Sequence, residues 1–185
     1  MSIQFDKVQP KNKAQLKSLI EYAFNHNIYD LNFIDTSKIT EMSELFGNVE
    51  HDFDVSSWDV SNVIDISFMF YGCHNFNCDL SKWDVSNVTN MSYMFSNCYK
   101  LEGKGLEHWD VSNVTCMEYM FNGCKNFNCD LSYWDVSNVT DMDNMFDGCK
   151  KFNCDLSDWN ISNITRWKNM FAGCDKMTIP NWYKL

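Results

Sequence analysis

Apolar residues recur along this chain at fixed distances, and the polar residues between them recur as well. The segment Trp-Asp-Val-Ser-Asn-Val, or a close variant of it, begins each repeat. The first residues of the six repeats are Ile34, Trp58, Trp83, Trp109, Trp134 and Trp159. They are 24, 25, 26, 25 and 25 residues apart. A period in this range is typical of a solenoid, so the sequence predicts a stack of six coils.

Each coil is expected to contain one short helix. Val88, Met91, Met94 and Phe95 are spaced i, i+3, i+6 and i+7, which is one face of a helix of about two turns. A row of serines precedes this segment in each coil and is expected to supply helix N-caps. The row is Ser37, Ser61, Ser86, Ser112, Ser137 and Ser162. Two residues after the Phe, each coil has Gly or Asn, the residues that best tolerate a left-handed backbone at a helix end. That row is Asn48, Gly72, Asn97, Gly123, Gly148 and Gly173.

Each coil is also expected to contain one short strand. In the segment 75–79, alternation places Phe76 and Cys78 inward and the polar residues outward. The apolar positions fit a leucine-rich-repeat frame, and stacked strands would form a parallel sheet. The insertion at residues 101–106 is expected to form a bulge. The predicted fold class is therefore an α/β repeat, a short right-handed leucine-rich-repeat-like solenoid with one short strand and one short helix per coil.

The chain is expected to divide into an N-terminal cap, residues 1–30, and the solenoid, residues 31–185, which ends in a partial closing coil. Residues 2–8 alternate weakly and predict a short strand. Asn12 followed by Gln15 fits a helix-capping box. The amphipathic helix after it has an apolar stripe of Leu16, Leu19, Ile20, Ala23 and Phe24.

Charge and composition narrow the function classes. The net charge is −10 over 185 residues, which argues against binding nucleic acid through its phosphates. Residues 1–40 sum to +1, so the remainder carries −11. The N-terminus shows no signal-peptide pattern and no apolar run is long enough to span a membrane. Nine cysteines without such a signal indicate a reducing compartment such as the cytoplasm, or a trimmed chain.

The cysteines fall into two rows, with Cys116 apart. The first row is Cys73, Cys98, Cys124, Cys149 and Cys174, and the second is Cys78, Cys129 and Cys154. Val49 and Phe53 occupy these rows in the first coil, which favours a buried apolar slot over a metal ligand. In-register stacking also argues against disulfides between coils. A metal or redox protein remains an alternative.

A row of aspartates occupies the second position of the repeats. It is Asp35, Asp59, Asp84, Asp110 and Asp135, with Asn160 as the sixth member. An Asx-turn accepts Asn for Asp because it needs only a hydrogen-bond acceptor, so turn formation is favoured over calcium binding. Asp79, Asp130 and Asp155 on the strands are a weaker calcium candidate.

Nothing in the sequence converges on a catalytic site. The four histidines share no row, and there is no phosphate-binding loop or hydrolase motif. We therefore expect a protein that is not an enzyme, with no cofactor.

The repeat Trp-Asp-Val-Ser-Asn-Val-Thr-x-Met-x-x-Met-Phe-x-Gly-Cys-x-x-Phe-Asn-x-Asp-Leu-Ser, from Asp30 to about Trp182, resembles the BspA-like leucine-rich-repeat family. Repeats of this family also occur in mycoplasma lipoproteins of unknown function. The resemblance implies a bacterial surface protein, in some members an adhesin that binds host proteins, and it supplies no catalytic residues. It thus implies a cell-surface location, whereas the lack of a signal peptide and the free cysteines favour the cytoplasm.

The leading hypothesis is a non-enzymatic protein-interaction module that is expected to be a monomer. The alternative is a structural or assembly component, bacterial or viral, with no discrete ligand. The candidate partner-binding face is the outward side of the strands. Its residues are Asn75, Asn77, Asp79, Lys100, Glu102, Asn126, Asn128, Asp130, Lys151, Asn153 and Asp155. This polar face has no aromatic anchor, so a solvated face whose Asn side chains bond along the stack is an equal alternative.

Overall fold

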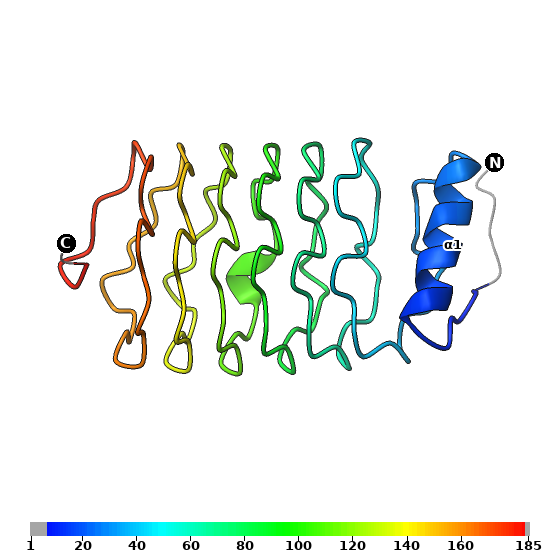
Figure 1. Ribbon diagram of the computed structural model, residues 1–185, viewed down its shortest axis with the longest axis horizontal. Helices are drawn as coiled ribbons and strands as arrows, with labels where there is room; N and C mark the ends of the chain where they lie inside the picture. Colours follow the sequence, from blue (N-terminus) through cyan, green and yellow to red (C-terminus); the bar gives the residue numbers. More distant parts are fainter. Residues whose placement is uncertain (1–6, 184–185) are drawn as a thin grey trace.

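The computed structural model describes residues 7–183, and an α-helix lies at the N-terminal end of this part of the chain. The helix α1 spans Lys13–Asn25 (Figure 1). Asn12 Oδ1 accepts a hydrogen bond from the backbone N–H of Gln15 at 3.0 Å, and Gln15 Oε1 accepts from that of Lys11 at 2.9 Å. The side chains that α1 buries are Leu16, Ile20 and Ala23. The helix expected after Asn12 is therefore present, with its reciprocal cap.

The predicted strand at residues 2–8 lies mostly outside the described residues. Val8, at its end, makes an isolated parallel bridge with Ile34. Beyond α1 the chain winds into a row of coils stacked along the long axis of the molecule (Figure 1). Backbone hydrogen bonds join each coil to the next. The repeats of the sequence thus correspond to stacked coils.

The predicted α/β leucine-rich-repeat fold is wrong, because the coils contain neither the strand nor the helix expected in each. Within residues 7–183 the helical segments are α1 and the short 3-10 helix η1, Leu106–His108. β-Pairing in the same range is confined to isolated parallel bridges. The longest series of bridges runs through Glu41, Asp65, Asn90, Cys116, Asp141 and Arg166. Most of each coil is a succession of turns.

The segment 88–95 shows why the helix prediction failed. Met91 and Met94 are buried, as the apolar spacing requires, but Tyr93 between them has a left-handed φ of 58°. The N–H of Met94 bonds to the carbonyl of Met91 in a turn, whereas the N–H of Tyr93 bonds to Glu118 in the next coil. An alternation of this kind interrupts a helix at every second residue. The serines therefore cap no helix.

The strand prediction failed because side chains take the place of backbone partners. At residues 75–79, Phe76 is fully buried as expected, whereas Cys78 is only half-buried. The Asn77 side chain accepts the backbone N–H of Glu102 at 2.9 Å, so a sheet ladder does not continue there. The insertion at residues 101–106 consequently forms no sheet bulge. It contains Gly103 and Gly105 with φ of 95° and 90° and leads into η1.

Hydrogen bonds along one side of the stack all point the same way. In the second coil, four N–H groups at alternate residues donate to carbonyls of the third coil at 2.8–3.2 Å. The pairs are Ile66 to Asn90, Phe68 to Ser92, Phe70 to Met94, and Gly72 to Ser96. The same four bonds occur in each of the five junctions from residues 42–48 to residues 166–172. This one-way ladder is the main backbone connection between coils.

Four repeated residue types donate in the opposite direction, each to a carbonyl of the preceding coil. The Trp indoles do so at 2.8–3.3 Å, from Trp58, Trp83, Trp109, Trp134, Trp159 and Trp182. The Asn amides do so at 2.6–2.9 Å, from Asn62, Asn87, Asn113, Asn138 and Asn163. The first-row thiols donate to carbonyls of the preceding coil at 2.9–3.1 Å. The backbone N–H groups of Thr89 and of the equivalent Thr in later coils do so at 2.9 Å. The repeat retains Trp, Asn, Thr and Cys because these groups satisfy buried or inter-coil carbonyls.

The interior is an aromatic column flanked by methionines. The rings of Phe46, Phe70, Phe95, Phe121, Phe146 and Phe171 stack in sequence. Their centroids are 5.4–5.8 Å apart, and the ring planes lie 2–9° from parallel. Burying each Phe contributes roughly 1.5–3 kcal/mol. Offset stacking adds about 0.5–1.5 kcal/mol per pair.

Candidate functional site

The Asn residues of the predicted polar face bond along the stack. Asn75 donates its amide to the Glu50 carbonyl, and Asn126 donates to that of Tyr99 at 2.9 Å. Asn128 accepts the backbone N–H of Asn153 at 3.0 Å, as Asn77 does for the next coil. These amides hold neighbouring coils together, which is the structural alternative recognised in the sequence.

The acids of the polar face shape turns. Asp79, Asp130 and Asp155 each accept the backbone N–H of the residue two positions on, at 3.0 Å. Lys104 also pairs with Asp79 at 2.6 Å and lowers the pKa of that carboxyl to about 2. The exposed members of the face include Lys100, Glu102, Lys151 and Asn153. Binding of a partner by this face stays a prediction.

The row that starts with Asp35 forms Asx-turns in every coil. Each side-chain oxygen accepts the N–H of the Ser two residues later, at 3.0–3.2 Å. Asn160 makes the same bond as the aspartates, so a negative charge is not needed. The turn-forming interpretation is confirmed.

The cysteines are free, and the first row is buried. Cys73, Cys98, Cys124 and Cys149 are fully buried, whereas Cys174 is half-buried. Burial raises the pKa of Cys73 to about 12 and places those of Cys98, Cys124 and Cys149 well above the ordinary thiol value. These thiols are neutral donors to backbone carbonyls.

The second-row thiols lie beside carboxylates. Cys78 Sγ is 3.4 Å from Asp54 Oδ1, and Cys154 Sγ is 3.3 Å from Asp130 Oδ1. Burial raises the pKa of Cys78 to about 12, and the charge of Asp54 adds to this effect. Within residues 7–183, no three His, Cys, Asp or Glu side chains are grouped as metal ligands. The metal alternative gains no support from these pairs.

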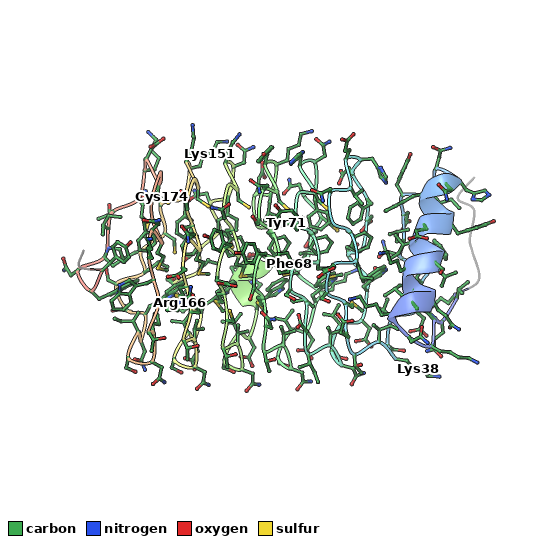
Figure 2. All side chains as sticks on the ribbon, viewed as in Figure 1. Lys38, Phe68, Tyr71, Lys151, Arg166 and Cys174 are labelled. Atoms are coloured by element: carbon green, nitrogen blue, oxygen red, sulfur yellow. The ribbon has the colours of Figure 1, made fainter. Side chains whose placement is uncertain are left out.

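Sequence reasoning missed a second candidate surface, the aromatic stripe formed by Phe68, Tyr93 and Tyr119. The three rings stack nearly parallel, with centroid distances of 4.5 and 4.6 Å, and all three residues are half-buried. Tyr71 packs beside Phe68 with ring centroids 5.9 Å apart; both are labelled in Figure 2. Three aromatic residues at one position of consecutive coils were the signal in the sequence.

The stripe occupies a strained backbone position. Phe68, Tyr93 and Tyr119 have φ values of 57°, 58° and 54°, a conformation that bulky side chains rarely adopt. At the equivalent positions Glu44, Asn144 and Asn169 have φ of 57°, 55° and 55°. The coil geometry therefore imposes the left-handed backbone, and Asn would fit it with less strain than Tyr. The central coils carry rings at these positions despite that strain.

Acids flank the stripe. Glu118 precedes Tyr119, and burial followed by the charge of Glu118 raises the pKa of Tyr93. Burial and then Asp141 raise the pKa of Glu118 itself. Arg166 pairs with Asp141 at 2.7 Å and with Asp143 at 2.6 Å. The surroundings of the stripe are thus predominantly negative.

At its N-terminal end the stripe borders a groove beneath α1. The groove has a volume of about 380 Å³ and lies between α1 and the first two coils. Phe68 and Tyr71 line one side, and Ile20 and Phe24 of α1 line the other. Lys17 and Glu21 of α1 also line the groove. Because Phe68 belongs to both the stripe and the groove, the two form one continuous surface.

The fold and its ladders define a repeat protein built from stacked coils of about 25 residues. The model of the family described as "Mycoplasma protein of unknown function, DUF285" matches residues 14–105 and 99–183, and the chain belongs to this family. The expected relation to mycoplasma proteins of unknown function is therefore confirmed, whereas the BspA-like leucine-rich-repeat relation stays a prediction. No curated protein and no solved structure matches the chain. None of the helices in residues 7–183 has the length and apolar character needed to cross a membrane.

Proposed function

We propose that the protein is a non-enzymatic protein-interaction module and that the aromatic stripe, with the groove beside it, is its binding surface. The observation that carries the proposal is the half-exposed stack of Phe68, Tyr93 and Tyr119. Tyr is enriched at interaction hot spots because one side chain supplies apolar area and a hydroxyl. The polar face lacks such residues, and its amides already bond between coils.

The charge around the stripe indicates the chemistry of the partner. The charges of Glu118 and Asp141 act on Tyr93, Arg166 pairs with Asp141, and the chain carries a net charge of −10. Complementary charge speeds encounter and selects partners. We therefore expect a basic segment, in which Arg side chains pack against the rings and pair with the acids.

The test is selection from a phage-displayed peptide library against the intact chain. Peptides rich in Arg and Lys should be enriched. The variants Tyr93→Asn and Tyr119→Asn should weaken their binding about tenfold or more, as for loss of hot-spot residues. Asn occurs naturally at this position in the fifth and sixth coils, so these variants should fold.

Two controls distinguish the surfaces. Tyr133→Asn changes a tyrosine that is 89% exposed and lies outside the stripe, and it should leave binding unchanged. The double reversal Asp130→Lys with Asp155→Lys alters the polar face. If that reversal abolishes binding while the stripe variants do not, the polar face is the site and the stripe proposal is wrong. Failure to enrich any basic peptide would also refute it.

A further inference from the structure

One long edge of the stack carries exposed lysines in consecutive coils, and Lys151 marks this edge in Figure 2. Side chains of neighbouring coils touch there. The His74 ring stacks on Tyr99 with centroids 4.3 Å apart, and Lys125 Nζ lies 4.2 Å from the centroid of the Tyr99 ring. The ion pairs within residues 7–183 involve none of the lysines of this basic edge, which are Lys100, Lys125, Lys150 and Lys151. Glu102 follows Lys100 by two residues, so the positive charge is greatest in the fourth and fifth coils.

The opposite long edge carries carboxylates. Lys38, labelled at that edge in Figure 2, belongs to the turn that Asp35 begins. The equivalent turns of the second to fifth coils begin with the exposed residues of this acidic edge, Asp59, Asp84, Asp110 and Asp135, and none of them is in an ion pair in the described part of the chain. Hydrogen bonds from the Ser side chain and then from its backbone lower the pKa of Asp84 and Asp135, so these carboxylates are ionised and held in place. Lys82 precedes Asp84 by two residues, so the negative charge is also greatest in the fourth and fifth coils.

The two edges match coil by coil. The fourth coil has Asp110 on one edge and Lys125 on the other, and the fifth has Asp135 opposite Lys150 and Lys151. The stacked Phe rings of successive coils are 5.4–5.8 Å apart, and both edges follow this repeat because they belong to the same coils. A second copy that lies beside the first in the same orientation therefore sets each lysine against the aspartate of the corresponding coil.

We propose that the basic edge binds the acidic edge of a second copy of this chain, so that the stacks associate side by side and parallel. Like charges that follow one another along an edge repel, and opposite charges at the same repeat relieve that repulsion. The contact uses different patches on the two copies, so it does not close on itself and can add further copies. It uses neither the aromatic stripe nor the groove, so this proposal and the proposed function stand or fall separately.

The test is sedimentation velocity of the intact chain over a range of protein and salt concentrations. At about 0.1 mM protein and about 0.02 M salt the chain should form dimers and larger species, which about 0.5 M salt should dissociate. The triple variant Lys125→Glu, Lys150→Glu and Lys151→Glu should weaken this association about tenfold or more. The matched control makes the same change of net charge at exposed lysines outside the basic edge, and it should weaken association about twofold at most. Its substitutions are Lys7→Glu, Lys11→Glu and Lys168→Glu.

A second triple variant removes the charge of the acidic edge and keeps its turns. Asn160 forms the same turn as the aspartates, so Asp84→Asn with Asp110→Asn and Asp135→Asn should fold, which near-ultraviolet circular dichroism checks. This variant should also weaken association about tenfold or more. A mixture of the two triple variants should associate again, because one keeps its aspartates and the other keeps its lysines.

Three results would overturn the proposal. They are a wild-type chain that stays monomeric at low salt, as expected from the sequence, folded variants that associate as the wild type does, and a mixture that stays monomeric. A monomeric chain that binds inorganic polyphosphate through the lysines of the basic edge would overturn it in favour of a polyanion.

Discussion

At some repeated positions of this molecule, the backbone conformation restricts which residue types can occur. The Gly and Asn row from Asn48 to Gly173 has φ between 62° and 77° at all six positions. The sequence predicted this conformation correctly from residue type, although it placed the row at helix ends that do not exist. A Cβ added at Gly123 would lie 2.6 Å from the Asn97 side chain. The constraint therefore combines a left-handed backbone with a close approach of the preceding coil.

Gly123→Val should destabilise the protein by about 1–3 kcal/mol more than Asn122→Val, because a β-branched residue is strained in the left-handed region. Gly123→Asn should be milder than Gly123→Val, since Asn48 and Asn97 occupy the same row. Urea unfolding of the three variants measures the differences. Equal losses for the two Val variants would show that position 123 is not constrained as described.

The first-row thiols should react only when the protein unfolds. Burial raises the pKa of Cys73 to about 12 and raises those of Cys98, Cys124 and Cys149 well above the ordinary thiol value, so the thiolate is scarce at pH 8 in the folded state. Counting thiols with a chromogenic reagent should show these four reacting at the rate of global unfolding. The half-buried Cys78, Cys116 and Cys154 should react earlier. Rapid reaction of all nine in the native state would contradict the buried row.

The same pKa shift sets the sign of a stability change with pH. The folded-state pKa of these thiols is above the unfolded value near 9.0, so their contribution is complete below pH 9 and is lost as pH rises toward 12. Stability measured by urea unfolding should therefore fall between pH 8 and pH 10. A rise over that interval would contradict the assignment of neutral buried thiols.

At the scale of the element, the unit of this structure is the turn. Asp135 accepts the N–H of Ser137 at 3.0 Å, and Asn160 does the same for Ser162 in the next coil. Asp135→Asn should therefore change stability by less than about 0.5 kcal/mol, whereas Asp135→Ala should cost about 1 kcal/mol through the lost acceptor. Thermal unfolding with and without calcium checks both. A loss in Asp135→Asn equal to that in Asp135→Ala, or stabilisation by calcium, would show that the charge matters.

The elements were the part of the fold that sequence could not predict. Spacing identified which side chains face inward, and Met91, Met94 and Phe95 are buried as expected. It could not show whether an N–H pairs within its own segment or with the next coil, because a helix and a series of turns bury the same positions. The decisive residue is Tyr93, whose left-handed φ is imposed by stacking and contradicts its residue type. The aromatic stripe was missed for the same reason, since its row also contains Glu44 and Asn144.

At the scale of the whole molecule, each coil gives and receives the same set of bonds. Deleting residues 125–149 joins Cys124 to Lys150 and brings the donors of the fourth coil against the acceptors of the sixth. The shortened chain should fold cooperatively, with a urea m-value reduced roughly in proportion to the surface removed. Near-ultraviolet circular dichroism and urea unfolding check this.

The control deletion removes only residues 125–136, about half a coil. It shifts the Trp, Asn and Cys ladders out of register and should leave the protein without a cooperative transition. If both deletions behave alike, the coils are not interchangeable units.

The one-way ladder also has an electrical consequence. Each peptide group carries a dipole of about 3.5 D, and in an ordinary sheet these dipoles alternate and largely cancel. Here four peptide dipoles per junction are aligned, with their N–H ends toward the C-terminal end of the stack. The Thr and side-chain donors oppose only part of this sum. The negative end of this peptide sum lies at the N-terminal end of the stack, where α1 carries Lys13 and Lys17, so the side-chain charges of the molecule oppose the peptide dipoles.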